Sequence, residues 1–236
     1  PFMETIRKQH EDIVKSSQMR QEFTANVSHE LKTPLTAISG YAELIANGMT
    51  SGDDTIRFAG EISKSSNRLL TLINDILRLS ELDASTEVPM EEIDLYELAE
   101  KCVSMLQISA EKQNVTLMLT GKPTRMQANR EMMEELLYNL VSNAIRYNRP
   151  YGNVVVSVSR EDDHVDLAVE DTGIGISQAD QGRIFERFYR VDKSRSKSTG
   201  GTGLGLAIVK HVVQCHGAKL DLKSQLGSGT RIEIKF

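Results

Sequence analysis

The first third of the chain carries two apolar stripes at helical spacing, and these stripes restrict the possible folds more than any other feature. The first lies within residues 4–47 and consists of Phe23, Val27, Leu31, Pro34, Ile38, Ala42 and Ile45. It ends at Asn47-Gly48, where glycine accepts the left-handed conformation that closes a helix. The second runs to about residue 83 and steps by three and four through Ala59, Ile62, Ser66, Leu69, Ile73, Ile76 and Ser80.

Two helices of this kind predict a hairpin, but one hairpin cannot cover both stripes. Two copies would make a four-helix bundle, so the pattern predicts a homodimer. The helical pattern breaks at Ala84, and the Ser, Thr and Pro residues that follow predict a linker at 85–89. We therefore expect a helical domain over residues 1–84 and a second domain over residues 90–236.

The periodicity changes in the second domain. Alternating or continuous apolar runs predict strands at 88–93, 115–120, 125–128, 154–160, 165–170, 219–223 and 231–236. Helical spacing recurs at 95–112, 130–147 and 204–216. This order predicts an α+β domain, a sandwich in which a mixed sheet carries helices on one face. Residues 177–202 contain few apolar residues and are long for a passive connection, so we expect a mobile lid there.

Composition excludes several classes of protein. The chain has 236 residues, 39% of them hydrophobic, and a formal net charge of -5. It shows no basic patch with interleaved aromatic residues, so a nucleic-acid partner is not expected. No apolar run approaches the ~20 residues of a membrane span. Because the sequence begins at Pro1, inside a helical pattern, we expect a fragment with a missing upstream part.

The segment Ser28 to Leu35, SHELKTPL, places a histidine beside a carboxylate on the first helix. At about 100° per residue, His29 lies roughly 200° from Val27 and faces away from the apolar stripe. Thr33 shares that outward face. Pro34 cannot donate a hydrogen bond to the Glu30 carbonyl, so we expect the helix to bend or loosen there. By itself the motif also fits an ordinary surface histidine. The remaining histidines carry no such motif and are interpreted as structural: His10, His164, His211 and His216.

A polar stripe lies on the helix expected at 130–147. It consists of Glu135, Asn139, Asn143 and Arg146, at intervals of four, four and three residues. An amide oxygen followed one turn later by a cation suits Mg²⁺ and phosphate. By itself the stripe is weak evidence, because an Asn and Arg stripe more often marks a solvated helix face.

The segment Asp171 to Ile176, DTGIGI, follows directly after a predicted strand. Its carboxylate can accept a hydrogen bond from an exocyclic amine such as that of adenine. Its glycines lack Cβ and allow the backbone to approach a flat ring closely. In isolation the segment is also compatible with a plain glycine turn.

Two further motifs follow. Residues 183–190, RIFERFYR, combine aromatic anchors with Arg190, which could reach phosphate oxygens, although a short amphipathic helix has the same pattern. Residues 200–207, GGTGLGLA, open a helix, where free backbone N–H groups and the helix dipole favour phosphate. The loop lacks the P-loop pattern and does not follow a first strand, which disfavours P-loop and Rossmann enzymes.

In this order, SHELKTPL, the Asn139/Asn143 helix, DTGIGI, RIFERFYR and GTGLGLA resemble the cytoplasmic catalytic core of a bacterial sensor histidine kinase. The resemblance covers nearly the whole chain and is closer to the transmembrane type than to the chemotaxis type. It implies a dimeric hairpin and a separate Bergerat-type ATP-binding domain. The implied cofactors are ATP and Mg²⁺, and the implied partner is a response regulator. It also implies a cytoplasmic fragment of an inner- or plasma-membrane protein, whose only membrane contact is through missing upstream segments.

Carried over to this sequence, the resemblance makes His29 the phosphoacceptor, Glu30 the base or orienting carboxylate, and Thr33 a residue that positions water for regulator dephosphorylation. Asn143 would hold Mg²⁺ with support from Asn139. The expected nucleotide-binding set also contains Arg146, Tyr147, Asp171, Gly173, Gly175, Ile176, Arg190, Thr202, Gly203, Leu204, Gly205 and Leu206. Arg146 stands where many members have lysine, so the phosphate contact there differs in geometry.

Two alternatives stay open. One is a nucleotide-sensing dimer scaffold without kinase activity, and the intact His29-Glu30 pair argues against it. The other is a different ATPase of the same nucleotide-binding superfamily, such as a topoisomerase or chaperone domain. The helical hairpin disfavours that alternative.

Overall fold

The computed structural model describes residues 2–84, 88–161, 163–191 and 201–236. It divides into two compact units, Pro1–Leu77 and Arg78–Phe236. Most of the predicted linker, and residues 192–200 of the predicted lid, lie outside the described residues. The unit boundary falls inside the second helix, and the domain limits 1–84 and 90–236 stay predictions. No helix in the described ranges is long and apolar enough to cross a membrane.

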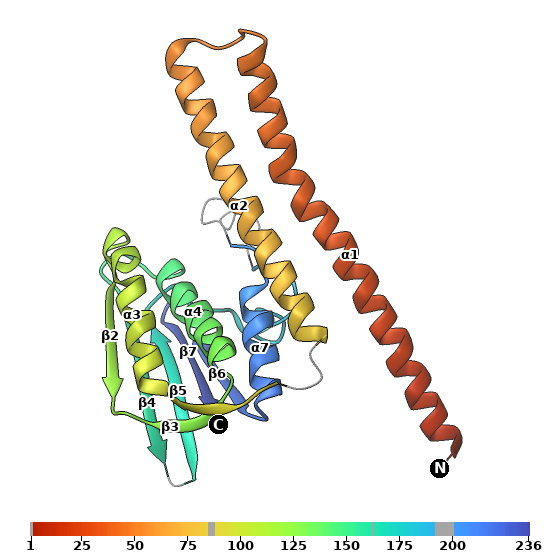
Figure 1. Cartoon of the computed structure of the whole chain (residues 1–236), viewed down its shortest axis with the longest axis vertical. Coiled ribbons are helices and arrows are strands. Elements are labelled where there is room, and N and C mark those ends of the chain that lie inside the picture. The colour runs from red at the N-terminus through yellow and green to blue at the C-terminus, as the bar shows by residue number, and fades with distance from the viewer. Residues whose placement is uncertain (1, 85–87, 162, 192–200) are drawn as a thin grey trace. The chain divides into compact units, whose positions relative to one another are not determined.

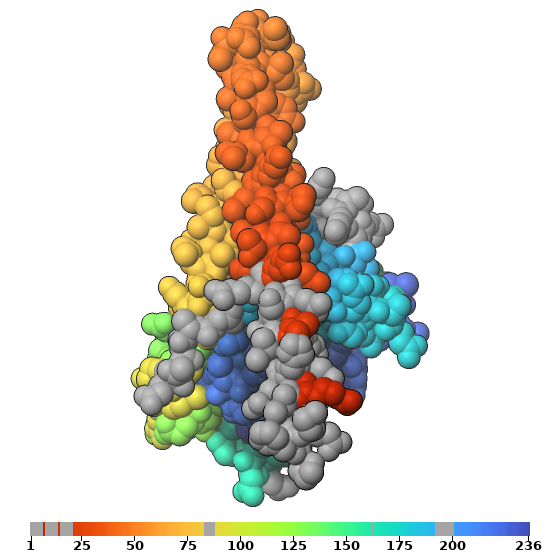
Figure 2. Space-filling model, turned by 90° about the vertical axis from the view of Figure 1, so that its right-hand side faces the viewer, coloured from red at the N-terminus to blue at the C-terminus, as the bar shows by residue number. Residues whose placement is uncertain are grey.

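The first unit is a helical hairpin (Figure 1). Helix α1 spans Phe2–Ala46 and continues through the buried Pro34. Helix α2 spans Gly52–Ala84, with Asp53 and Asp54 in its first turn, where negative charge suits the helix dipole. Gly48 has a φ of 67° in the connection, as its position after the first stripe predicted. Figure 2 views the hairpin from the α1 side, where side chains of α1 form the surface.

The predicted stripe of α1 is largely half-buried, and Tyr41 packs against Phe58 of α2 with ring centroids 5.0 Å apart. Ala42 is the exception, because it is exposed in the single chain. On α2, a row of apolar residues at heptad spacing stays exposed: Ile56 at 75%, Leu70 at 59%, Ile73 at 38% and Leu77 at 57%. This row is the apolar face that a second hairpin would cover.

The second unit is a mixed sheet with helices on one face, which confirms the α+β prediction (Figure 1). The strand order is β2-β4-β5-β7-β6, and only β2 and β4 pair in parallel. The strands are β2 Thr116–Gly121, β4 Asn153–Glu161, β5 His164–Asp171, β6 Lys219–Gln225 and β7 Gly229–Lys235. The covering helices are α3 Leu95–Lys112, α4 Arg130–Arg146 and α7 Gly205–Cys215. A short helix, α5, spans Gln178–Gln181.

The alternation of side chains between the two faces of β4 and β5 explains where the core lies. Val156 pairs with Val169 and Val158 with Leu167, and all four side chains are buried. Intervening residues such as Ser157 belong to the opposite face. Helix α4 buries Leu136, Leu137, Leu140 and Val141, so its polar stripe remains on the other side of the helix.

A separate antiparallel pair joins β1, Glu91–Asp94, to β3, Arg125–Ala128. The expected strand at 88–93 was therefore placed too early, since it included Pro89, which has no N–H to donate to a ladder. Asp94 ends β1 and caps α3, because its carboxylate accepts from the backbone N–H groups of Tyr96 and Glu97.

Candidate functional site

His29 lies exposed on α1, as its position relative to the apolar stripe predicted. Thr33 is also exposed, and its hydroxyl donates to the His29 carbonyl at 3.2 Å. The two residues therefore sit one turn apart on the same outward side of the helix.

Glu30 points toward the second helix of the hairpin. Its Oε2 accepts a hydrogen bond from Nη2 of Arg68 at 3.3 Å, and the Arg68 side chain is only 18% exposed. Sequence reasoning missed Arg68, and the only signal for it was its place next to Leu69 of the predicted α2 stripe. Arg68 therefore competes for the carboxylate that the resemblance assigns to proton transfer.

The four residues of the α4 stripe are all half-buried. The helix that carries them begins at the Asn129 cap, whose side chain accepts from the Met132 N–H. Asn139 donates from Nδ2 to the carbonyl of Glu135 at 3.0 Å. On its other side, a Cβ added to Gly205 would lie 2.5 Å from Oδ1 of Asn139. The start of α7 thus rests directly against the polar stripe, and any side chain at position 205 would have to displace the Asn139 amide.

The glycine-rich segment before α7 also lies against the end of α4. A Cβ on Gly201 would lie 3.1 Å from Nη1 of Arg146 and 3.3 Å from the Tyr147 hydroxyl oxygen. Gly203 has a φ of 78°, and its carbonyl accepts from the Phe188 N–H at 2.8 Å. Sequence reasoning did not include Gly201 among the binding residues, although it belongs to the quoted glycine run.

Side chains of the same loop hold its shape. The Thr202 hydroxyl accepts from the Leu204 N–H at 3.3 Å, and Thr202 is 8% exposed. Leu204 is fully buried and anchors the loop in the core. Leu206 follows in the first turn of α7 and is half-buried. The Thr202 hydrogen bond and the buried Leu204 side chain therefore hold the loop in place. The first backbone N–H groups of α7 have no partner within the helix and can bind an anion.

Asp171 ends β5 in a desolvated position. Burial raises the pKa of its carboxyl to about 6, although hydrogen bonds from the backbone of Gly173 and Thr230 act in the opposite direction. The Gly173 N–H donates to Oδ1 at 2.8 Å. The Asp171 carboxylate is thus partly shielded from water and is held by the backbone of the following turn. Such a carboxylate can accept a strong hydrogen bond from one donor group of a ligand.

The DTGIGI turn packs against the residue that follows α4. Ile174 donates its N–H to the Tyr147 carbonyl at 3.1 Å, and a Cβ on Gly173 would lie 2.3 Å from that oxygen. Gly175 has a φ of 66° and would clash with the Gln225 carbonyl if it carried a side chain. Ile176 is half-buried and donates its N–H to Ser224 at 2.8 Å.

Arg149 is a site residue that sequence reasoning missed. Its Nε and Nη2 donate to the Gly173 carbonyl at 3.2 and 2.9 Å, and Nη2 also donates to the Gly227 carbonyl. It thereby ties the DTGIGI turn to the β6–β7 turn. The only sequence signal was an arginine just beyond the expected end of α4, beside Pro150.

The segment before Arg190 is fixed by aromatic residues. Phe188 is buried, the Tyr189 hydroxyl donates to Asp180 at 2.6 Å, and Arg183 lies over the Tyr189 ring at 4.3 Å from its centroid. Arg190 itself is half-buried.

Helix α4 is the common support of the residues predicted to bind the nucleotide. Asn139, Arg146 and Tyr147 contact the glycine loop or the DTGIGI turn, and Asn143 lies between them on the same stripe. The structure therefore brings together two motifs that are separated by about 30 residues in sequence. His29, Glu30 and Thr33 belong to the other unit.

Comparison with known proteins identifies both units. The model of the His Kinase A (phospho-acceptor) domain matches residues 19–85. The model of the histidine kinase-, DNA gyrase B- and HSP90-like ATPases matches residues 128–236. The first match contains the SHELKTPL segment, and the second contains all the glycine-rich segments.

Comparisons over most of the chain point to the same family as the two domain models. The chain is 40% identical over 220 residues to the sensor-like histidine kinase SenX3 of Mycolicibacterium smegmatis, covering 92% of this chain and 57% of SenX3. It thus spans a little more than half of that relative. Among solved structures, Acinetobacter baumannii histidine kinase AdeS has a TM-score of 0.72 at 25% identity, covering 88% of this chain and 96% of AdeS.

A further structure, histidine kinase ThkA in complex with the response regulator protein TrrA, has a TM-score of 0.76 at 22% identity. It covers 94% of this chain and 63% of ThkA, and it supports the fold alone. From the two domain matches and the long alignment, the chain belongs to the sensor histidine kinases and carries their phosphoacceptor and ATP-binding portions.

Proposed function

We propose that this chain binds Mg-ATP in its second unit, transfers the γ-phosphoryl group to His29 and then passes it to an aspartate of a response regulator. The observation that carries the proposal is the packing of the glycine loop against Asn139 and Arg146, on the same helix that supports the DTGIGI turn.

The residues of the second unit fit a purine nucleotide. Asp171, which is desolvated at the end of β5, would accept the adenine amine. Gly173 and Gly175, where a Cβ would meet the Tyr147 and Gln225 carbonyls, allow the turn that would hold the ring. The loop at Thr202, Gly203, Leu204 and Gly205 would contact phosphate oxygens, chiefly through backbone N–H groups. The Leu204 N–H would first have to leave the Thr202 hydroxyl. Arg146 and Arg190 would add positive charge.

The α4 stripe also fits a magnesium ion. Asn143 would supply an amide oxygen to Mg²⁺, and Asn139, fixed between Glu135 and Gly205, would keep the stripe in place. When bound, the ion neutralises phosphate charge. The chain contributes the positioning, which is the main source of catalysis in phosphoryl transfer.

In the transfer step, a ring nitrogen of His29 attacks the γ-phosphorus, the bond to the β-phosphate oxygen breaks, and ADP leaves. The proton of the attacking imidazole passes to Glu30, which must first part from Arg68. The exposed position of His29 leaves it accessible both to the nucleotide and to the receiver aspartate.

The exposed row on α2 supports a homodimer. Ile56, Leu70, Ile73 and Leu77 would be covered by the partner hairpin in a four-helix bundle. ThkA is described in complex with a response regulator, and a receiver domain is the partner that an exposed phosphohistidine requires. Thr33 would position water for dephosphorylation of that partner. The fragment would belong to a membrane sensor, on the cytoplasmic side.

Phosphotransfer separates this proposal from the scaffold alternative. The full chain is incubated with γ-labelled ATP and Mg²⁺, freed of nucleotide, and mixed with purified receiver domains. A kinase becomes labelled and then loses the label to one receiver. A scaffold binds ATP and never acquires label.

A further inference from the structure

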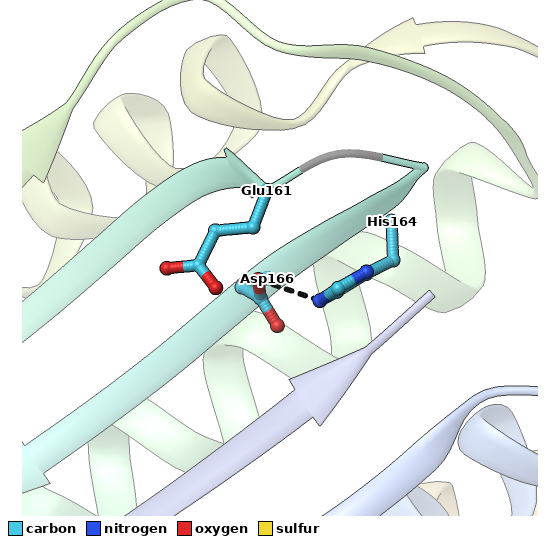
Figure 3. A group of neighbouring side chains, drawn as sticks. All are labelled: Glu161, His164 and Asp166. Atoms are coloured by element: carbon cyan, nitrogen blue, oxygen red, sulfur yellow. Dashed lines mark ion pairs between the residues drawn. The ribbon is translucent and has the colours of Figure 1, made fainter.

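A cluster of metal-ligating side chains lies at the turn between β4 and β5, outside the proposed nucleotide set. Glu161 ends β4, and His164 and Asp166 lie two residues apart on β5 (Figure 3). Glu161 and His164 are directly paired across the hairpin. Pairing and the two-residue period therefore place all three side chains on one face of the sheet.

That face is the one opposite the covering helices. Val165 and Leu167, which alternate with the cluster residues, belong to the buried core. The cluster is also remote from Asp171: five residues of extended strand separate Asp166 from it, about 17 Å at 3.4 Å per residue. A ligand at the cluster would thus be independent of the nucleotide.

Asp166 is buried without hydrogen bonds from the described residues. Its side chain is 8% exposed, and neither carboxylate oxygen has a hydrogen-bond partner there. The buried Nε2 of His164 is in the same situation and lies 3.4 Å from Oδ2 of Asp166. Burying a carboxylate in this way is unfavourable unless a positive charge compensates it.

We propose that Glu161, His164 and Asp166 form a binding site for a divalent transition-metal ion of the Zn²⁺ type. Their three ligand atoms lie within 4.8 Å of one another. Around a tetrahedral Zn²⁺ with bonds of about 2.1 Å, ligand atoms stand about 3.4 Å apart. The required contraction is small, and the exposed Glu161 side chain is free to turn inward.

The donor set determines the class of ion. One imidazole nitrogen and two carboxylate oxygens suit Zn²⁺ or a similar borderline ion, whereas Mg²⁺ prefers oxygen ligands alone. Three protein ligands leave a fourth position for water or for an external ligand.

The Lys235 ammonium group would compete with a metal ion for the Asp166 carboxylate. It pairs with Asp166 across β5 and β7, and its Nζ lies 3.9 Å from Oδ1 of Asp166. The lysine side chain is 45% exposed, so it can move into solvent when a metal ion takes its place. Removal of this competing charge should therefore strengthen metal binding.

The test uses the full chain, stripped with a chelator and kept free of nucleotide. Zn²⁺ is titrated by calorimetry, and Co²⁺ is added separately to record the visible absorption of a tetrahedral site. We expect one ion per chain. Glu161→Gln, which alters only an exposed side chain, and His164→Ala should each weaken binding at least tenfold, and Lys235→Met should tighten it several-fold.

Asp163→Asn is the matched control, because Asp163 is an exposed carboxylate of the same turn that is absent from the cluster. The affinity of Asp163→Asn for Zn²⁺ should equal that of the wild type. No binding by the wild type would overturn the proposal, as would equal binding by the wild type and Glu161→Gln. In either case the cluster is only an ion pair shared by His164, Asp166 and Lys235.

Discussion

Nε of Arg78, near the end of α2, donates a hydrogen bond to Oε2 of Glu135 on α4 at 2.8 Å. Arg78 also pairs with Glu81 at 3.3 Å and Glu131 at 3.4 Å, and the Glu135 hydrogen bond is the largest influence raising the pKa of its guanidinium. The Glu135 carbonyl in turn accepts from Asn139. Glu135 of α4 thus links the last turns of α2 to Asn139 of the α4 polar stripe.

Arg78→Gln should destabilise the second unit. The change removes the ion pair between Arg78 and the part-buried Glu135, so we expect a loss of about 1 kcal/mol in the free energy of unfolding. Urea unfolding of the full chain measures it. Arg125→Gln is the control, because its pair with Glu92 has side chains 75% and 60% exposed and should contribute little. Equal losses in both variants would contradict a special role for Arg78.

Nucleotide affinity should depend on the ionisation of Asp171. The pKa of this carboxyl is raised from 3.8 to about 6, so the folded state favours the protonated form, and this preference costs stability as the pH rises through that range. In the proposed site, ATP binds the ionised form more tightly, because a carboxylate is a stronger acceptor for the adenine amine than a protonated carboxyl. We expect the affinity for ATP to fall roughly tenfold between pH 7.5 and pH 5 from protonation of Asp171 alone.

Calorimetry of the wild type and Asp171→Asn across that range isolates the contribution. The variant keeps a hydrogen-bond acceptor and cannot titrate at this position. Its own pH dependence therefore reports protonation of the nucleotide phosphates, and the difference between the two affinity profiles reports Asp171. Parallel pH profiles for the two proteins would exclude Asp171 as the adenine contact.

Gly205→Ala should impair ATP binding. The added methyl group would lie 2.5 Å from Oδ1 of Asn139, so either the Asn139 amide must leave its hydrogen bond to the Glu135 carbonyl or the start of α7 must shift. We expect at least a tenfold loss of affinity, measured with a fluorescent ATP analogue. Gly182→Ala serves as the control, because a Cβ there meets nothing within 4 Å. The account is wrong about this contact if Gly205→Ala binds as well as Gly182→Ala.

Thr33→Ala should spare autophosphorylation and slow dephosphorylation of the response regulator several-fold. The hydroxyl lies one turn from His29 on the same exposed side. Thr36→Ala is a close control, since its hydroxyl makes the same kind of bond, to the Lys32 carbonyl at 2.9 Å. Release of phosphate from a labelled regulator measures the rate. Equal rates for the two variants would remove the phosphatase role from Thr33.

Local patterns were sufficient to predict most elements of this fold. Helix α3 was placed at its observed limits, and the β4–β5 hairpin within about one residue, because periodicity and turn residues are local properties. The outward position of His29 followed from helix geometry alone.

Contacts between distant segments could not be predicted in this way. Arg149 reaches Gly227, 78 residues away, and Arg78 reaches Glu135, 57 residues away. Neither arginine differs in sequence from an ordinary surface cation. The close approach of Gly205 to Asn139 likewise depends on how α7 packs on α4, although the glycine run predicted that some close approach would occur.

The most direct test of the central claim is incubation with γ-labelled ATP and Mg²⁺ of the wild type, His29→Gln, and His10→Gln as a control on the same helix. We predict acid-labile, alkali-stable label, as a phosphoramidate requires, in the wild type and the control, and none in His29→Gln. Label that persists in His29→Gln would contradict the assignment of His29 as the phosphoacceptor.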